Sequence, residues 1–211
     1  MGQDMKRRCV IIGGAGIKSY QTLWDYLNPD DFNIFCDSGL LHQEALGIQP
    51  HLIVGDFDSH ENPHLDVETI VLPREKDDTD TVYAVKEAVK RGFDDFLLLG
   101  VAGGRLDHTL GNLSILLSLH AQGKRALLVD DYSEMEVVGR EPVYIDDCFP
   151  YFSLLNISGT ARGVTIEDAK YPLEDAEISC SYQYGVSNEV LPGRRARVSV
   201  KEGELLLIRV R

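Results

Sequence analysis

The stretch FLLLGVAGGRLDHTLGNLSILL, residues 96–117, joins three kinds of local signal that together indicate the class of fold. It begins with a continuous apolar run, residues 96–99, which is typical of a strand buried on both faces. Glycines then punctuate the chain, and beyond them leucine recurs at the spacing of one helical face, at Leu110, Leu113 and Leu117. A buried strand, a glycine turn and an amphipathic helix form one strand–helix unit of an α/β fold.

Similar units lie on both sides of this stretch. Valines at 82, 85 and 89 repeat at helical spacing after a Thr-Asp pair, which predicts a second helix. Strands that alternate with helices favour a mainly parallel, doubly wound sheet. The apolar runs expected to form its other strands are residues 9–12, 32–36, 52–54, 69–72 and 127–129.

The rhythm of the sequence changes near residues 130–135. The remaining chain has no helical period, but it has short alternating runs at residues 152–155 and 205–210, with Gly and Pro at short intervals between them. Such a pattern predicts an all-β part, either a small sandwich or a barrel. We therefore expect two domains, with the boundary close to residue 132.

Composition excludes several classes of partner. The 211 residues carry 34 acidic and 21 basic side chains, and the formal net charge of −13 disfavours nucleic-acid binding. No apolar run approaches the roughly 20 residues of a membrane span, so we expect a soluble protein with no membrane partner. The chain begins without an apolar secretory segment, and its cysteines show no CxxC pair, which indicates a reducing, cytoplasmic setting. The cysteines are Cys9, Cys36, Cys148 and Cys180.

The motif GDFDS, residues 55–59, follows an expected buried strand, where open α/β sheets place their ligands. If the backbone stays extended, Asp56 and Asp58 point to one side while Phe57 turns toward the core. Two converging carboxylates suit a hard divalent cation such as magnesium. The alternative is a solvated acidic turn.

Three further motifs lie at expected strand ends or helix starts. DDTD, residues 77–80, offers either metal ligands or helix caps, since Asp and Thr are also favoured at helix N-termini. GGRLDH, residues 103–108, offers backbone amides and Arg105 to an anion, or else forms a tight turn with Asp107 as N-cap. GGAG, residues 13–16, matches no established phosphate-binding pattern and favours a plain turn.

Taken together, the motifs closely resemble those of thiamine pyrophosphokinase in order and spacing. The matching segments are DSG (37–39), GIQPHLIVGDFDS (47–59), KDDTD (76–80) and GGRLDHTLGNL (103–113), with fainter matches at GVT (163–165), AKYPL (169–173) and GVSNE (185–189). The resemblance implies an α/β catalytic domain over residues 1–132 and a thiamine-binding β-sandwich over residues 133–211. It also implies a homodimer whose active sites lie between the catalytic domain of one subunit and the β domain of the other.

The resemblance further implies an activity. The terminal pyrophosphoryl group of ATP would pass to the hydroxyl of thiamine, giving thiamine diphosphate and AMP, with Mg²⁺ as cofactor. By position, the magnesium ligands are Asp56, Asp58 and Asp80, and the catalytic set adds Asp37 and Asp107. Residues matching the nucleotide side are Lys76, Asp77, Thr79, Gly103, Gly104, Arg105, His108 and Asn112. Residues matching the thiamine side are Tyr171, Ser187 and Asn188, with Tyr171 standing where many relatives have a Trp.

The chain departs from the family at one motif, and two other functions remain as alternatives. Many relatives read Asp-Gly-Gly-Ala-Asn where residues 37–41 read DSGLL, so the role of that Asn cannot be transferred. One rival is a magnesium-dependent kinase of another small alcohol, which would release ADP instead of AMP. Another is a catalytically silent protein that binds thiamine or nucleotide and acts as a regulator.

Overall fold

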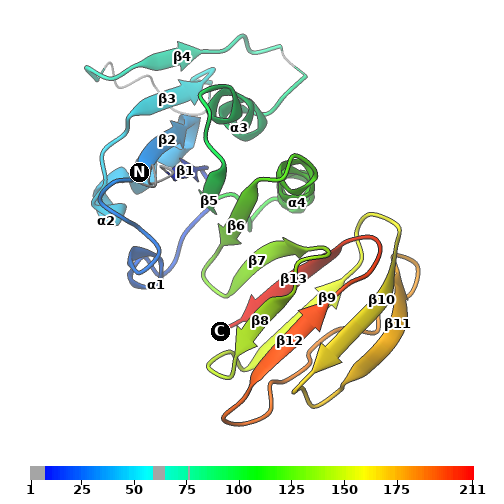
Figure 1. Ribbon diagram of the computed structural model, residues 1–211. Coiled ribbons are helices and arrows are strands. Elements are labelled where there is room, and N and C mark those ends of the chain that lie inside the picture. The colour runs from blue at the N-terminus through cyan, green and yellow to red at the C-terminus, as the bar shows by residue number, and fades with distance from the viewer. Residues whose placement is uncertain (1–7, 59–64, 76) are drawn as a thin grey trace, which may run out of the picture. The chain divides into compact units, whose positions relative to one another are not determined.

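The chain forms two compact units, divided between Asp131 and Tyr132, in a computed structural model that describes residues 8–58, 65–75 and 77–211 (Figure 1). The first unit is α/β. Its elements are β1 (Cys9–Ile12), α1 (Gln21–Trp24), β2 (Phe32–Cys36), the 3₁₀ helix η1 (Asp37–His42), α2 (Gln43–Leu46), β3 (Leu52–Gly55), β4 (Thr69–Val71), α3 (Asp80–Lys90), β5 (Asp95–Leu99), α4 (Leu106–Ala121) and β6 (Arg125–Val129).

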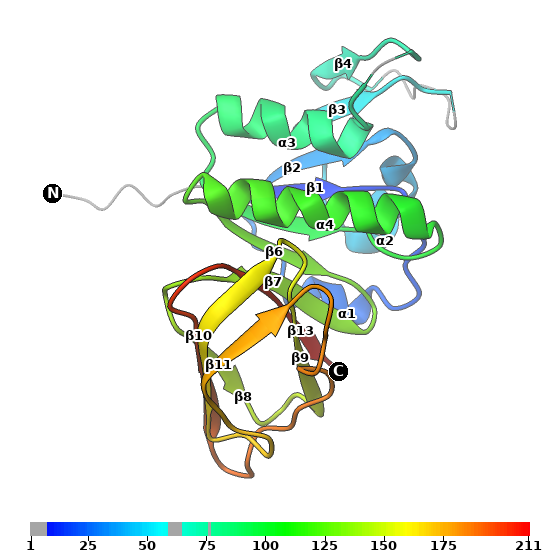
Figure 2. The ribbon, with the colours of Figure 1, turned by 90° about the vertical axis from the view of Figure 1, so that its right-hand side faces the viewer.

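The strands of the first unit form a parallel sheet in the order β4-β3-β2-β1-β5-β6. Helices α3 and α4 cover one face, and the short helices α1 and α2 lie on the other (Figure 2). Strands β1 and β3 are buried along their whole length, which explains their continuous apolar runs. The predicted doubly wound sheet is confirmed, and its switch point lies between β1 and β5, where such sheets bind ligands.

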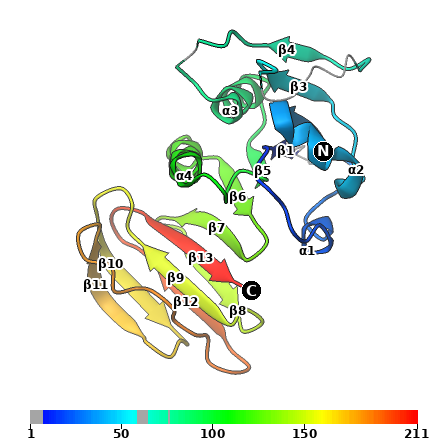
Figure 3. The ribbon, with the colours of Figure 1, turned by 180° about the vertical axis from the view of Figure 1, so that it is seen from behind.

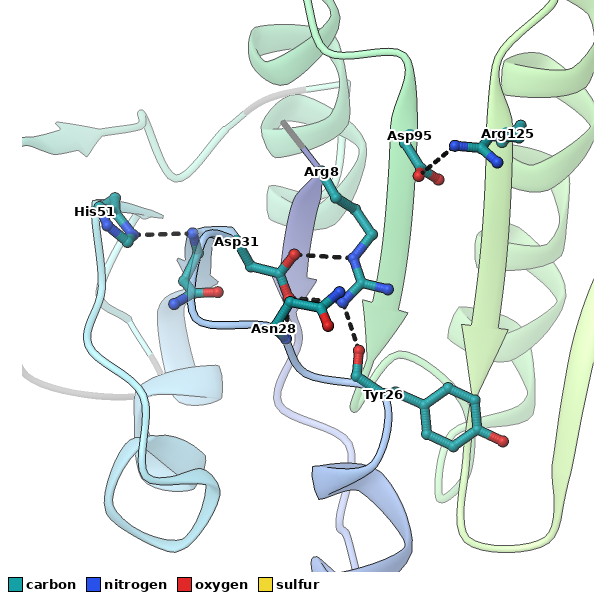
Figure 4. A network of polar contacts seen from close by, with 8 residues as sticks. Arg8, Tyr26, Asn28, Asp31, His51, Asp95 and Arg125 are labelled. Carbon is teal, nitrogen blue, oxygen red and sulfur yellow. Dashed lines mark hydrogen bonds and ion pairs between the residues drawn. The ribbon is translucent and has the colours of Figure 1, made fainter. Parts of the chain in front are cut away.

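Polar contacts fasten the amino ends of these strands (Figure 4). The carboxylate of Asp31, which precedes β2, accepts hydrogen bonds from the Arg8 guanidinium at 2.6 and 2.9 Å and from the Asn28 amide at 2.8 Å. Arg125, at the start of β6, pairs with Asp95, at the start of β5, at 2.8 Å. With the starts of the strands aligned in this way, their carboxyl ends meet at the opposite edge of the sheet.

The second unit is a β-sandwich (Figure 3). One sheet pairs β7 (Ser133–Val138), β13 (Leu205–Val210) and β9 (Tyr151–Leu155), all antiparallel. The other, also antiparallel, has the order β11 (Leu173–Ser179), β10 (Thr160–Glu167), β12 (Arg195–Ser199) and β8 (Val143–Asp146). Both sheets contribute fully buried side chains to one core, such as Phe152 from the first and Val164 from the second. The all-β prediction is confirmed.

Local geometry corrects two expectations and adds two short helices. Strand β3 ends at Gly55, and Phe57 has a φ of +55°, so the backbone of the GDFDS motif is not extended as the alternation argument assumed. The residue at the N-cap of α4 is Arg105, so Asp107 lies inside the helix and is not its cap. Helices α1 and α2 have four residues each, too few for a hydrophobic period to reveal them. No helix in the described part of the chain has the length and apolar character needed to cross a membrane.

Candidate active site

A pocket of about 550 Å³ opens at the carboxyl edge of the parallel sheet. Its walls come from the turns after β1, β2, β3 and β5 and from the first turns of α3 and α4. The lining residues are Gly13, Gly14, Ala15, Gly16, Cys36, Asp37, Ser38, Asp56, Asp58, Thr79, Asp80, Thr81, Gly100, Val101, Gly103, Gly104, Arg105, His108 and Asn112. Most of the residues predicted for metal and nucleotide therefore share one cavity.

Backbone crowding brings the first carboxylates together. Asp37 follows β2 directly and has a φ of +40°, in the left-handed region. Gly55 ends the neighbouring strand so close to Asp37 that a Cβ on the glycine would lie 3.1 Å from the Asp37 Cβ. Glycine at position 55 therefore lets the turn after β2 approach the turn that carries Asp56.

Three carboxylates converge at this place. Asp37, Asp56 and Asp58 each offer one oxygen, and the three oxygens lie within 4.8 Å of one another. Burial raises the pKa of Asp37, and the nearby charges of Asp80, Asp56 and Asp58 raise it further, against a backbone hydrogen bond that lowers it. The Asp37 Oδ1 atom is buried without a hydrogen-bond partner among the described residues.

This donor set fits a hard divalent cation. A cation would relieve the repulsion between the carboxylates and give the buried Asp37 oxygen a ligand bond. The geometry adds Asp37 to Asp56 and Asp58, whereas the resemblance had named Asp80 as the third ligand. Asp80 lines the same pocket and acts on Asp37 through its charge.

The residues of the DDTD motif make different contacts. Asp80 opens α3 and lines the pocket, while the Thr79 hydroxyl accepts the Val82 amide at 3.3 Å as the N-cap. Asp78 pairs instead with Lys86 at 2.6 Å, and Asp77 is exposed outside the lining residues. Lys76 and Ser59 lie outside the described residues.

Helix α4 holds the turn after β5 in place. Buried Asn112 donates from Nδ2 to the Val101 carbonyl at 2.7 Å, and the Gly103 amide donates to the Thr109 hydroxyl at 3.0 Å. Gly103 and Gly104 have φ values of +100° and +68°, which glycine adopts readily. Asn112 thus acts on the pocket through the backbone of the turn.

The exposed side chains of Arg105 and Asp107 form an ion pair of 2.6 Å at the start of α4. The Arg105 hydrogen bond lowers the pKa of Asp107 to about 2, so Asp107 is an anion at neutral pH. Arg105 lines the pocket together with His108, and Asp107 does not. The side chain of Asp107 therefore orients the guanidinium at the pocket rim.

The loop GGAG, residues 13–16, belongs to the pocket although its sequence favoured a plain turn. A Cβ at Gly14 would lie 1.8 Å from the Ser38 hydroxyl, so this loop and the turn after β2 touch. The signal that points to this loop is its place after the first strand of a doubly wound sheet, beside the switch point. No sequence pattern alone distinguishes it from other glycine turns.

The three residues matched to thiamine gather in the second unit. Tyr171 and Asn188 are joined by two hydrogen bonds, from the Tyr171 amide to Asn188 Oδ1 at 3.0 Å and from Asn188 Nδ2 to the Tyr171 carbonyl at 2.8 Å. Asn188 is buried and Tyr171 is exposed. Exposed Ser187 has a φ of +58°, and its amide donates to the Ser153 hydroxyl at 3.0 Å. The Lys170 ammonium lies 5.7 Å from the centroid of the Tyr171 ring, so a face of that ring already accepts a cation.

A doubly wound sheet whose switch-point pocket gathers carboxylates, glycine turns and an arginine defines the class of α/β enzymes that act on phosphate-bearing ligands. Two family models match the chain: thiamin pyrophosphokinase, catalytic domain, over residues 23–128, and thiamin pyrophosphokinase, vitamin B1 binding domain, over residues 141–205. The chain belongs to the thiamin pyrophosphokinase family, and its activity is that of a thiamine diphosphokinase, EC 2.7.6.2.

Individual relatives are similar to this chain over nearly its full length. The thiamine pyrophosphokinase of Bacillus subtilis is 28% identical over 207 residues, which cover 94% of this chain and 96% of the relative. The crystal structure of a B. subtilis thiamine pyrophosphokinase superposes with a TM-score of 0.84 at 26% identity, covering 97% of this chain and 99% of that one. The structure of the Geobacillus thermodenitrificans protein gives 0.82 at 28% identity, with 97% of each chain covered.

Proposed function

We propose that this chain transfers the pyrophosphoryl group of ATP to the hydroxyl of thiamine, releasing thiamine diphosphate and AMP. The observation that carries the proposal is the single pocket in which the carboxylates of Asp37, Asp56 and Asp58 face a glycine turn and Arg105. Residues 1–132 serve as the catalytic domain, and residues 133–211 bind thiamine. The two matching family models support this division of roles.

Magnesium is the cofactor in this proposal, held by Asp37, Asp56 and Asp58 with Asp80 beside them. When bound, the ion supplies positive charge to phosphate oxygens and lowers the cost of the charge that builds up as the group is transferred. The buried, unpartnered oxygen of Asp37 supports a role as ligand. Asp80 adds negative charge that attracts the cation.

The nucleotide phosphates are bound by the turn after β5. The N-terminus of the 16-residue helix α4 favours an anion, and Arg105 adds a charge-assisted contact. Asp107 pairs with Arg105 at 2.6 Å and aims its guanidinium. Lys76, Asp77, Thr79, Gly103, Gly104, His108 and Asn112 complete the nucleotide side. Phosphoryl-type transfer relies mostly on positioning and electrostatics, which these groups provide.

Thiamine is bound by the second unit. The ring of Tyr171 stacks on the cationic thiazolium, as its contact with the Lys170 ammonium supports. The side-chain amide of Asn188 is hydrogen-bonded to the backbone of Tyr171 and therefore holds the ring in place. Ser187 offers its exposed hydroxyl to the substrate.

The assembly is a homodimer in the cytoplasm, with each active site built from the catalytic domain of one subunit and the β domain of the other. Family membership supports this arrangement. The four cysteines Cys9, Cys36, Cys148 and Cys180 are free thiols, which supports a reducing compartment.

Product analysis tests the proposed function. The purified protein with ATP, thiamine and Mg²⁺ should yield AMP and thiamine diphosphate in equal amounts, resolved by chromatography. Asp56→Asn should lower turnover by at least about 100-fold with the fold retained, because a metal ligand is lost. Asp78→Asn, at a carboxylate that pairs with Lys86 outside the pocket lining, is the matched control and should leave turnover near the wild-type value. Release of ADP, or wild-type turnover by folded Asp56→Asn, would contradict the proposal.

A further inference from the structure

A buried histidine, His42, contacts the glycine loop of the pocket without lining the pocket itself. It ends η1, and both of its ring nitrogens have partners. Nδ1 lies 2.8 Å from the hydroxyl oxygen of Tyr20, and Nε2 lies 3.0 Å from the carbonyl oxygen of Ala15. The rings of His42 and Tyr20 are also neighbours, with their centroids 5.9 Å apart.

These partners determine which nitrogen of His42 carries the hydrogen. A carbonyl oxygen only accepts, so Nε2 must donate to Ala15. The Tyr20 hydroxyl can donate or accept, and in the neutral imidazole it donates to Nδ1. Burial lowers the pKa of His42, partly offset by the bond to Ala15, in agreement with a neutral ring.

Hydrogen bonds hold the loop between β1 and α1 at several positions, and His42 makes the hydrogen bond at its centre. The Ala15 amide donates to the Gly100 carbonyl at 2.8 Å, and the Ala15 carbonyl accepts from His42. Farther along, the Asp131 carboxylate accepts the amides of residues 18 and 19 at 2.8 to 3.0 Å. Both backbone groups of Ala15 are therefore bonded, one to the switch-point turn and one to His42.

The loop needs such external support because residues 13–16 are three glycines and an alanine. Glycine has the largest backbone freedom to lose on ordering, and no residue of this loop has a polar side chain that could hold the loop by a hydrogen bond. A pocket wall that is ordered before the ligand arrives costs less at binding than one that the ligand must order.

We propose that His42 is a positioning residue for nucleotide binding, which acts by locking the carbonyl of Ala15 and thereby the shape of the loop at residues 13–16. The proposal rests on the proposed function, because it requires the pocket of the first unit to take the ATP phosphates. It predicts a selective effect on the nucleotide. Thiamine binding and the chemical step stay close to their wild-type values.

The test compares His42→Leu with His42→Gln. Leu removes both hydrogen bonds, whereas Gln keeps a donor and an acceptor. For His42→Leu, the KM of ATP and the Kd of a nonhydrolysable ATP analogue with Mg²⁺, measured by calorimetry, should rise about tenfold. The KM of thiamine and kcat should change less than about twofold, and His42→Gln should recover most of the loss.

Two more variants keep the test decisive. His51→Leu is the matched control, since His51 Nδ1 accepts the Asn33 amide at 3.1 Å near the amino end of β3, outside the pocket lining. It should leave the Kd of the analogue unchanged. Tyr20→Phe removes only the hydroxyl that bonds to His42 and should raise that Kd about threefold. If His42→Leu does not fold, Tyr20→Phe and His42→Gln carry the comparison, and wild-type affinity in Tyr20→Phe then overturns the inference.

The remaining outcomes also decide whether the inference holds. Folded His42→Leu that binds the analogue as the wild type does would overturn the inference and leave the proposed function standing. Equal losses in analogue affinity, thiamine KM and kcat would indicate general structural damage, and would also overturn it. If the wild-type protein itself fails to bind the analogue with Mg²⁺, the proposed function fails and the inference fails with it.

Discussion

At the scale of single residues, Asp37 shows how the site conflicts with stability. The residue is only 7% exposed, and one of its carboxylate oxygens has no hydrogen-bond partner among the described residues. Burial raises its pKa, and the nearby charges of Asp80, Asp56 and Asp58 raise it further. A charged carboxylate in such a place destabilises the metal-free protein, and either protonation or a bound cation relieves the repulsion.

Asp37→Asn should therefore make the metal-free protein more stable while it weakens metal binding. At pH 7 we expect the free energy of unfolding to rise by on the order of 1 kcal/mol, because a buried like-charge contact is removed. The raised pKa means that folding favours the protonated acid, so stability is lost as the pH rises through that pKa in the wild type. The gain of the variant should accordingly shrink as the pH is lowered toward 4. Urea unfolding in EDTA measures it.

The same variant should bind Mg²⁺ at least about tenfold more weakly by calorimetry, since a ligand with a full charge is lost. Asp78→Asn is the control, because Asp78 pairs with Lys86 on the surface, and both quantities should stay near wild type. A destabilised Asp37→Asn with unchanged Mg²⁺ affinity would show that Asp37 is structural.

At the scale of elements, the pocket depends on turns that approach one another closely. The turn after β1 touches the turn after β2 through Gly14 and Ser38, and β3 approaches the latter through Gly55 and Asp37. Helices α3 and α4 begin at the same edge and contribute Asp80 and Arg105. Because these turns touch one another, a small change in one turn reaches the carboxylates on the next.

Gly14→Ala tests this coupling between turns. The added methyl would lie 1.8 Å from the Ser38 hydroxyl, next to Asp37, so one of the two turns must shift. We expect the Kd of the ATP analogue with Mg²⁺ to rise at least about tenfold, because a displacement near 1 Å at a site costs that much or more. Calorimetry measures the affinity, and thermal unfolding shows that the fold is kept.

The double variant Gly14→Ala with Ser38→Gly removes the clash and should recover most of the affinity. Gly111→Ala, in α4, places a methyl in open space and is expected to leave the affinity unchanged. If the double variant binds no better than Gly14→Ala alone, contact with Ser38 is not the reason for the loss.

At the scale of the whole molecule, the net charge and the division into two units both affect how the substrates bind. The net charge of −13 is partly local, since four carboxylates line one pocket, and a metal ion would reduce this negative charge where ATP enters. The residues proposed for ATP belong to the first unit and those proposed for thiamine to the second. Pyrophosphoryl transfer requires both substrates in one site, and in the proposed homodimer each site combines the catalytic domain of one subunit with the β domain of the other.

Mixed dimers test whether that joining occurs between subunits. Asp56→Asn damages only the catalytic domain and Tyr171→Ala only the β domain, so each protein alone should be strongly impaired. If each site is shared, random mixing by refolding together should restore about a quarter of the wild-type activity, because half of the dimers are mixed and each has one intact site. Activity that stays at the level of the separate variants would place both substrates within one chain.

Much of the fold follows from local sequence. Continuous apolar runs marked the buried parallel strands, and the loss of helical period after residue 129 marked the β-sandwich, because both patterns reflect burial within a few neighbouring residues. The short helices α1 and α2 were not predicted, since four residues make little more than one turn and show no hydrophobic period. The left-handed backbone at Phe57 was not predicted either, because an aromatic residue gives no local signal of a positive φ.

Motifs and periods along the chain are enough to indicate the class of fold, the family and the set of carboxylates. Which side chains act together depends on the folded structure. It grouped Asp37 with Asp56 and Asp58, and it joined Asn188 to Tyr171. These partners are 17 or more positions apart and meet through strand order, crowded turns and cross-strand bonds, which local patterns do not encode.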